Sequence, residues 1–192
     1  MKKFFAMAIL AIASLSASAE GLYVGGSLGF WHDSNDKDNH GLTTNNLTIL
    51  PEVGYNLSDK WAVGTVVGYD YTHLCNLGTS VNLFQFNPYV RYTYFRTSNN
   101  FLSLFLDGTV GVGAGWASYD DDDEDSKTAC TWQIGIKPGV ALNFTKNFSF
   151  VAHIGLLGYE GANNAAQAAG YSNKGGLMLS GNNLTFGFYY NF

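Results

Sequence analysis

Five ionisable residues lie within segments that otherwise carry little charge, which makes them the first candidates for chemistry. Each lies roughly six to eight residues from a predicted short turn, so a rise of about 3.3 Å per residue would bring them to one level. Their formal charges cancel, and enclosed charges need partners because an unpaired buried ion costs roughly 3–5 kcal/mol. We predict a neutral ion-pair network that plugs the interior; a gated ion path and a catalytic Glu/His pair are the alternatives. The residues are Glu52, Arg91, Asp107, Lys137 and His153.

A serine and a histidine flank the segment 73–80, where a hydrolytic enzyme could place a nucleophile and its base. By strand parity, His73 and Ser80 would both face outward near one rim of the molecule. A catalytic serine also needs a base that is oriented by a third group. The nearby acid Asp70 would point inward instead, so we predict ordinary polar residues here and assign no catalytic residue.

Acidic residues are concentrated in two further segments. The run 120–125 lacks the alternating ligands and central glycine of an EF-hand loop, so it predicts a solvated surface loop; a weaker alternative is that it gathers divalent cations. The first loop could also bind a metal, but richness in His and Asp alone is not specific, and we predict no metal or cofactor. The residues of that loop are His32, Asp33, Asp36, Asp38 and His40.

The two cysteines, Cys75 and Cys130, both fall at the stems of predicted loops. Two cysteines in an exported protein commonly pair. Their strands are not neighbours in the sequence, so a bridge requires the loops to fold over the mouth of the molecule. The sequence leaves a disulfide and two free thiols equally open.

The composition of the 192 residues limits the scaffold that could hold these groups. Only 13% of residues are charged, whereas 46% are hydrophobic and 16% aromatic, which excludes an ordinary disordered chain. The formal charge of −5 argues against a nucleic-acid partner bound through a basic face. After the first twenty residues, no apolar run is long enough for a membrane helix.

The first 19 residues have the pattern of a cleavable secretory signal. Two lysines precede the apolar stretch from Phe4 to Ala13, and small residues follow up to Ala17-Ser18-Ala19. We therefore expect residues 1–19 to be removed and residues 20–192 to form one exported barrel domain.

Apolar and small polar residues alternate with a period of two along the rest of the chain, which predicts strands. The polar face consists mainly of Gly, Ser, Thr and Asn, too small and too uncharged for a water-exposed surface. An apolar face toward lipid and a small polar face toward the lumen are typical of a transmembrane β-barrel, whose closure leaves no unpaired backbone edge. A secreted lipocalin-like barrel is the soluble alternative. The eight predicted strands are 22–30, 47–56, 61–71, 84–94, 102–112, 132–144, 148–156 and 183–192.

The connections between these strands alternate in length. Short periplasmic turns and long outer loops are usual in outer-membrane barrels, so we expect both termini on the periplasmic side. Aromatic residues near both ends of the strands would then lie at the two membrane interfaces. Tight turns are predicted near Ser58-Asp59, 97–99 and 145–147, and longer connections at 32–46, 73–80, 117–129 and 160–176.

The signal, the eight alternating segments and the last strand resemble the small outer-membrane barrels of the OmpA/OmpX-like, porin-like superfamily. The resemblance implies an all-β fold, an eight-stranded antiparallel up-and-down transmembrane β-barrel in the bacterial outer membrane. Phe188, Tyr190 and Phe192 look like the C-terminal assembly signal of this family, which the barrel-assembly machinery reads.

Fold alone does not decide function in such a family. We expect a non-enzymatic integral outer-membrane protein that supports the envelope or displays its loops, with a plugged lumen. Its partners would be outer-membrane lipid, lipopolysaccharide and the assembly machinery, with an extracellular ligand bound through the loops. An adhesin, a small-solute channel and a lipid A-modifying enzyme are the alternatives.

Overall fold

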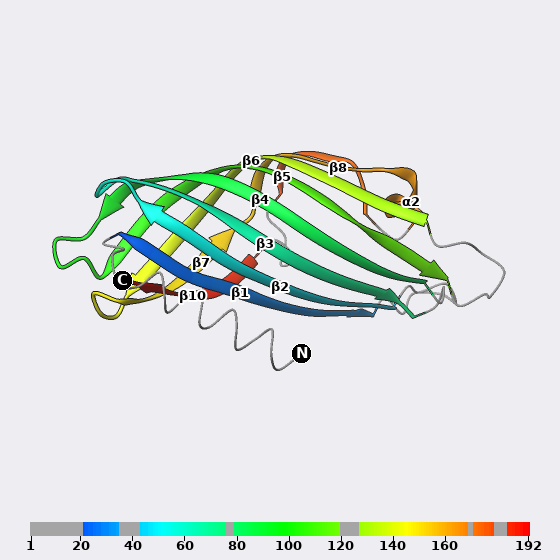
Figure 1. Ribbon diagram of the computed structural model, residues 1–192, viewed down its shortest axis with the longest axis horizontal. Coiled ribbons are helices and arrows are strands. Elements are labelled where there is room, and N and C mark those ends of the chain that lie inside the picture. Colours follow the sequence, from blue (N-terminus) through cyan, green and yellow to red (C-terminus); the bar gives the residue numbers. More distant parts are fainter. Residues whose placement is uncertain (1–20, 35–42, 76–78, 120–126, 169–170, 179–183) are drawn as a thin grey trace.

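The computed structural model shows an elongated barrel formed by a single closed sheet of antiparallel strands (Figure 1). Both the start of β1 and the end of β10 lie at the same end of the barrel, together with the short connections. We call this the turn end and the opposite one the loop end. The structure describes residues 21–34, 43–75, 79–119, 127–168, 171–178 and 184–192.

Residues with high strand propensity, above all Val, Thr, Tyr and Phe, are frequent in the long strands. The strands are β1 (Leu22–Ser34), β2 (Thr43–Asn56), β3 (Trp61–Leu74), β4 (Thr79–Arg96), β5 (Leu102–Tyr119), β6 (Lys127–Asn143), β7 (Phe148–Ile154), β8 (Leu156–Ala162), β9 (Lys174–Met178) and β10 (Leu184–Asn191). A short helix, α2 (Asn164–Ala168), lies between β8 and β9.

The ladders form a closed circuit of eight antiparallel strands, as predicted. The order runs β5-β4-β3-β2-β1-β10-β7-β6, and pairing of β5 with β6 joins its two ends. β8 continues the seventh strand toward the loop end, and it pairs with β6 on one side and β9 on the other. Among the described residues, no helix is long and apolar enough to cross a membrane.

A hydroxyl group closes each of the three tight turns, which lie where they were predicted. The side-chain oxygen of Ser58 accepts from the backbone N–H of Trp61 at 3.1 Å. Thr97 accepts in the same way from Leu102 at 3.0 Å, and Thr145 accepts from Phe148 at 2.9 Å. Ser and Thr favour turns because their side chains can replace a backbone partner in this way.

The long connections are shorter than predicted, because the strands continue several residues into them. The segment 160–176 differs most: it contains the end of β8, the helix α2 and the start of β9. Alternation fades in these extensions, since toward the loop end polar residues occupy both faces of the strands.

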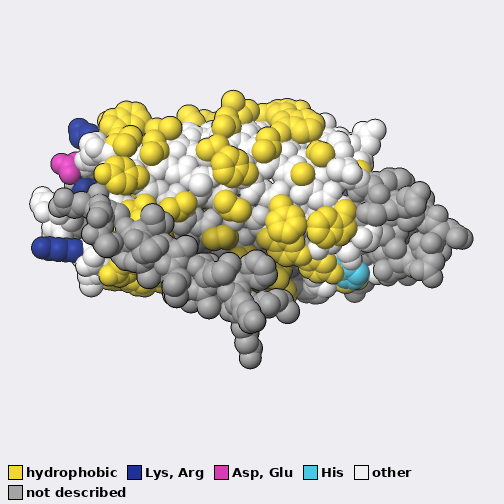
Figure 2. Space-filling model, viewed as in Figure 1, with side chains coloured by type: hydrophobic (Ala, Val, Ile, Leu, Met, Phe, Trp, Pro, Cys, Tyr) yellow, Lys and Arg dark blue, Asp and Glu magenta, His cyan; other side chains and the backbone are white. Residues whose placement is uncertain are grey.

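The predicted outward face is exposed and apolar. Phe30, Val67 and Val112 expose 69%, 52% and 62% of their surface. Figure 2 shows hydrophobic side chains over the length of the wall, while Lys, Arg, Asp and Glu side chains gather at the turn end. A contiguous apolar surface of this extent marks a contact with lipid or with another protein.

Leu156 was predicted on this outward face and is instead 1% exposed inside the barrel. Gly155 separates β7 from β8 and has a φ of +74°, a left-handed conformation that favours glycine. This interruption shifts the alternation by one position, so that Leu157, 50% exposed, takes the outward place.

Candidate functional site

Arg91 is the centre of a buried charged cluster in the half of the lumen near the turn end. Its Nε and Nη2 atoms donate to Oδ1 and Oδ2 of Asp107, each at 2.7 Å. This two-point geometry is the strongest arrangement of a guanidinium and a carboxylate. Nη2 also lies 3.5 Å from Oε1 of Glu52. The three residues are only 8%, 3% and 6% exposed, so solvent screens their attraction little.

His153 completes this set, which we call the Arg91 cluster: Glu52, Arg91, Asp107 and His153. Its Nε2 lies 2.9 Å from Oδ2 of Asp107, so the histidine reaches from β7 to a carboxylate on β5. Arg91 and Asp107 are direct partners in the β4–β5 ladder, whereas Glu52 comes from β2. The ionisable side chains of four strands thus meet across the lumen at one level.

Four aromatic rings surround the cluster, and we call them the aromatic collar: Tyr23, Tyr89, Phe105 and Tyr189. The hydroxyls of Tyr89 and Tyr189 donate to the two oxygens of Glu52, the second at 2.6 Å. The hydroxyls of Tyr23 and Tyr89 are hydrogen-bonded to each other. The guanidinium carbon of Arg91 lies 4.0 Å from the centre of the Phe105 ring, a cation–π contact.

Glycines in neighbouring strands make room for these rings. Each ring of the collar packs on one glycine, and a β-carbon at that glycine would overlap the ring. Glycine on the lumen face is therefore required for the collar to pack. The pairs are Tyr23 on Gly54, Tyr89 on Gly64, Tyr189 on Gly25 and Phe105 on Gly139.

Lys137 was predicted to belong to the same network, and the structure corrects this. It is the direct partner of Asp107 in the β5–β6 ladder, yet its ammonium has no ion pair with any carboxylate among the described residues. Asp107 is already occupied by Arg91 and His153, and the lysine extends into open space on the loop-end side.

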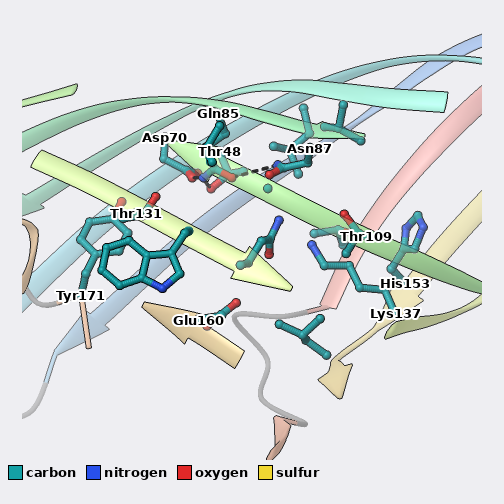
Figure 3. A pocket seen from close by; sticks show the side chains of 18 of the residues that line it. Thr48, Asp70, Gln85, Asn87, Thr109, Thr131, Lys137, His153, Glu160 and Tyr171 are labelled. Atoms are coloured by element: carbon teal, nitrogen blue, oxygen red, sulfur yellow. Dashed lines mark hydrogen bonds between the residues drawn. The ribbon is translucent and has the colours of Figure 1, made fainter. Parts of the chain in front are cut away.

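That space is a cavity of about 500 Å³ in the half of the lumen near the loop end. Figure 3 shows polar side chains converging on it from several strands. On one wall, Thr48 and Gln85 both donate to the carboxylate of Asp70. Asn87 extends this network by donating to Gln85 at 3.1 Å. Residues of the Arg91 cluster, including Asp107 and His153, form the closed floor.

The segment after β8 covers part of the mouth of the cavity. Ala166 of α2 packs on Val81, Ala129 and Ala162, and Tyr171 packs against the same cluster. Burial raises the pKa of Tyr171 to about 12, so its hydroxyl stays protonated at physiological pH. The side chain of Thr72 on β3 lies near this hydroxyl and offsets a small part of the rise, so the segment reaches the facing wall.

His73 and Ser80, on neighbouring strands, are hydrogen-bonded to each other, with Nδ1 and Oγ 3.0 Å apart. The ring of Tyr71 lies parallel to the imidazole at 6.5 Å. In the described part of the chain, no carboxylate lies within ion-pair distance of His73. The pair therefore lacks the orienting acid of a catalytic triad in these residues.

Both cysteines are free in the structure. Cys75 directly follows β3 and accepts a hydrogen bond from Asn45 at 3.3 Å, whereas Cys130 lies on β6. Two strands, β4 and β5, separate their positions in the wall. The alternative that the two form a disulfide is therefore not realised.

Several predicted features lie outside the described residues: the signal at 1–19, the acidic run at 120–125, and Asp36, Asp38 and His40. The backbone of His32 and Asp33 belongs to β1. Where the chain is described, no group of three or more His, Cys, Asp or Glu side chains is placed to hold a metal ion.

The sequence profile of the outer membrane protein β-barrel domain family matches residues 4–192. The chain belongs to this family. It is therefore an outer-membrane β-barrel protein, and its apolar wall faces the lipid of the bacterial outer membrane. No curated protein sequence is a significant match.

Two solved outer-membrane barrels show the same fold. The N-terminal β-barrel domain of Pseudomonas aeruginosa OprF has 15% identity and a TM-score of 0.50, with 91% of this chain and 98% of that one covered. Neisserial surface protein A (NspA) has 16% identity and a TM-score of 0.52, with 90% and 97% covered. At this identity the likeness concerns the fold alone.

Two features of this outer-membrane barrel were not predicted from the sequence: the aromatic collar and one acid of the cavity. Tyr23, Tyr89 and Tyr189 occupy inward positions of the predicted strands, so large rings on a face of glycines were the available signal. Glu160 had been assigned to a loop, whereas it lies on β8 and lines the cavity.

Proposed function

We propose that this protein is a non-enzymatic integral outer-membrane barrel that supports the envelope and displays loops outside the cell, with a lumen closed to ions. The turn end faces the periplasm in this proposal, and residues 1–19 are removed as the signal. Short connections at one end and long polar ones at the other support this orientation.

The Arg91 cluster is the observation that carries the proposal. Arg91, Asp107 and Glu52 satisfy one another across the lumen, and the collar fills the space around them. A conducting pore would keep water between these charges, whereas Arg91, Asp107 and Glu52 are all buried. An eight-stranded barrel is just wide enough for side chains to fill its interior.

Conductance of the refolded protein in planar lipid bilayers tests the proposal. We expect no stepwise ion currents from the wild-type protein under conditions in which a general porin conducts. A double variant, Arg91→Ser with Phe105→Ser, removes the core of the plug and serves as the positive control, since it should admit ions if it folds. Stable unitary currents from the wild-type barrel would contradict the proposal and favour a small-solute channel.

The partners in this proposal are lipopolysaccharide around the wall, the barrel-assembly machinery during insertion, and an extracellular ligand at the loops. Phe188 and Tyr190 face outward at the end of β10, where the machinery would meet them with Phe192. Exchange of the segment 160–176 for a short turn should abolish ligand binding without unfolding the barrel. Binding to host cells that survives exchange of this loop and of 32–46 would contradict loop display.

A further inference from the structure

A cation and an anion face the loop-end cavity; they attract each other across it, but neither has a direct ion pair among the described residues. Lys137 extends from β6 and Glu160 from β8, and both line the cavity. Neither side chain makes a hydrogen bond or ion pair with any residue in the described ranges. Leaving a charged group unpaired in a mostly enclosed space is costly, so the two positions are poised for a partner from outside.

The surroundings of the two charges are built for hydrogen bonds. Gln133 is the ladder partner of Glu160 and lies on the same strand as Lys137. Asn87 and Thr109 lie on the neighbouring strands β4 and β5, beside the Asp70 network, and face the same cavity as Lys137 and Glu160 (Figure 3). Orientation of a small ligand by a few convergent polar groups is typical of binding sites.

The cavity has one closed end. Asp107 and His153 of the Arg91 cluster line its floor, and the collar residue Tyr89 lies beside them. Its volume of about 500 Å³ falls within the usual range of small-molecule sites. A solute that enters from the loop end would therefore stop above the plug.

We propose that this cavity binds a small zwitterionic solute, with the carboxylate of the solute on Lys137 and its ammonium on Glu160. An anion alone would leave Glu160 unpaired, and a cation alone would leave Lys137 unpaired. A solute that carries both charges satisfies both groups at once, and its polar atoms can reach the amides and hydroxyls of the walls. The site is a receptor-like pocket above the plug, separate from any transport.

Isothermal titration calorimetry of the folded, full-length mature barrel in detergent micelles tests the proposal, with 4-aminobutanoate as the probe. Butanoate and butylammonium, each with one of the two charges, are the matched ligands. We expect 4-aminobutanoate to bind at least about tenfold more tightly than either of them, because it makes charged hydrogen bonds to both groups whereas each matched ligand makes them to only one. Equal binding of butanoate, or no binding of 4-aminobutanoate by folded protein, would overturn the proposal.

Two variants locate the site. Lys137→Met and Glu160→Gln should each weaken the binding of 4-aminobutanoate about tenfold or more. The charge exchange Lys137→Glu with Glu160→Lys should restore the affinity, because the ligand can bind in the opposite orientation. Lys174→Met tests the exposed lysine opposite Glu160 and should have a smaller effect. An unchanged affinity in both single variants would overturn the proposal.

Control variants remove the same charges elsewhere. Lys146→Met and Asp59→Asn lie in exposed tight turns at the far end of the barrel and should leave binding unchanged. The electrophoretic mobility of unheated samples reports whether each variant is folded, and only folded variants are compared.

Discussion

Arg91 and Asp107 stand directly opposite each other in the β4–β5 ladder and form a two-point ion pair, with both N–O distances at 2.7 Å. The pair lies inside a barrel whose outer wall is apolar, so the charges are separated from water by strands and rings. A pair in this position depends strongly on both partners, because removal of one leaves the other unpaired.

Replacement of Arg91 by methionine removes the guanidinium while it keeps a similar length of side chain. We expect a loss of about 3–5 kcal/mol in the free energy of unfolding, because the carboxylates of Asp107 and Glu52 lose their cation. Urea unfolding in lipid vesicles, followed by tryptophan fluorescence, measures this change.

Arg96→Met is the matched control, since Arg96 is an exposed arginine on the same strand that donates to Ser103. It should change the free energy of unfolding by less than about 1 kcal/mol. Equal stability of the two variants would show that the Arg91 cluster is not a paired network. The double variant Arg91→Met with Asp107→Leu should recover part of the loss, because it removes both charges.

Gly64 and Gly108 provide a test of the collar within the same sheet. A β-carbon at Gly64 would overlap the ring of Tyr89 and the carbonyl oxygen of Val53. Gly64→Ala should therefore destabilise the barrel by about 1–3 kcal/mol.

At Gly108 the nearest atom to an added β-carbon is the carbonyl oxygen of Val90 at 3.8 Å, an ordinary contact. Gly108→Ala should then change stability by no more than about 0.5 kcal/mol in the same unfolding measurement. A Gly64→Ala variant as stable as Gly108→Ala would mean that the rings can move aside at no cost.

Ser80→Ala removes the hydroxyl that lies 3.0 Å from His73. Because no orienting carboxylate accompanies this pair in the described residues, we expect no change in the lipid A mass spectrum of cells that carry the variant. Cells without the protein should give the same spectrum. The protein would instead be a lipid A deacylase if lipid A kept an acyl chain in Ser80→Ala cells and in cells without the protein, but lost it in wild-type cells.

Cys75 and Cys130 should both react with a small maleimide when the membrane is solubilised without reductant, since both thiols are free. Mass spectrometry of the intact protein would then show two added groups. A mass without added groups, restored to two by prior reduction, would demonstrate the disulfide that the structure lacks.

Strict alternation explains why the sequence could predict the cluster. In a strand every second side chain faces the same side, so Glu52, Arg91, Asp107 and His153 could be assigned to the lumen from their apolar neighbours alone. The tight turns set their height along the barrel. Neither alternation nor turn position shows which side chains are in contact across the lumen. Lys137 was therefore placed in a network that it does not join.

Local interruptions mark where the prediction failed. A single left-handed glycine, Gly155, reverses the faces of β8, and no periodic pattern reveals the φ of one residue. Glu160 and β9 were assigned to a loop because glycine and polar residues there hide the alternation. The collar was missed although alternation places its three tyrosines inward, because the sequence does not show that each ring packs on a glycine of a neighbouring strand.

Thiol accessibility on both sides of the Arg91 cluster tests the closed lumen most directly. In a background with Cys75→Ser and Cys130→Ser, single cysteines replace Gln133, which lines the cavity and is only half-buried, and Ser103, which is buried toward the turn end. Intact cells are then treated with a charged maleimide that does not cross membranes. We predict rapid labelling at position 133 and none at position 103 until the barrel is unfolded; equal labelling of both positions on intact cells would contradict the plug.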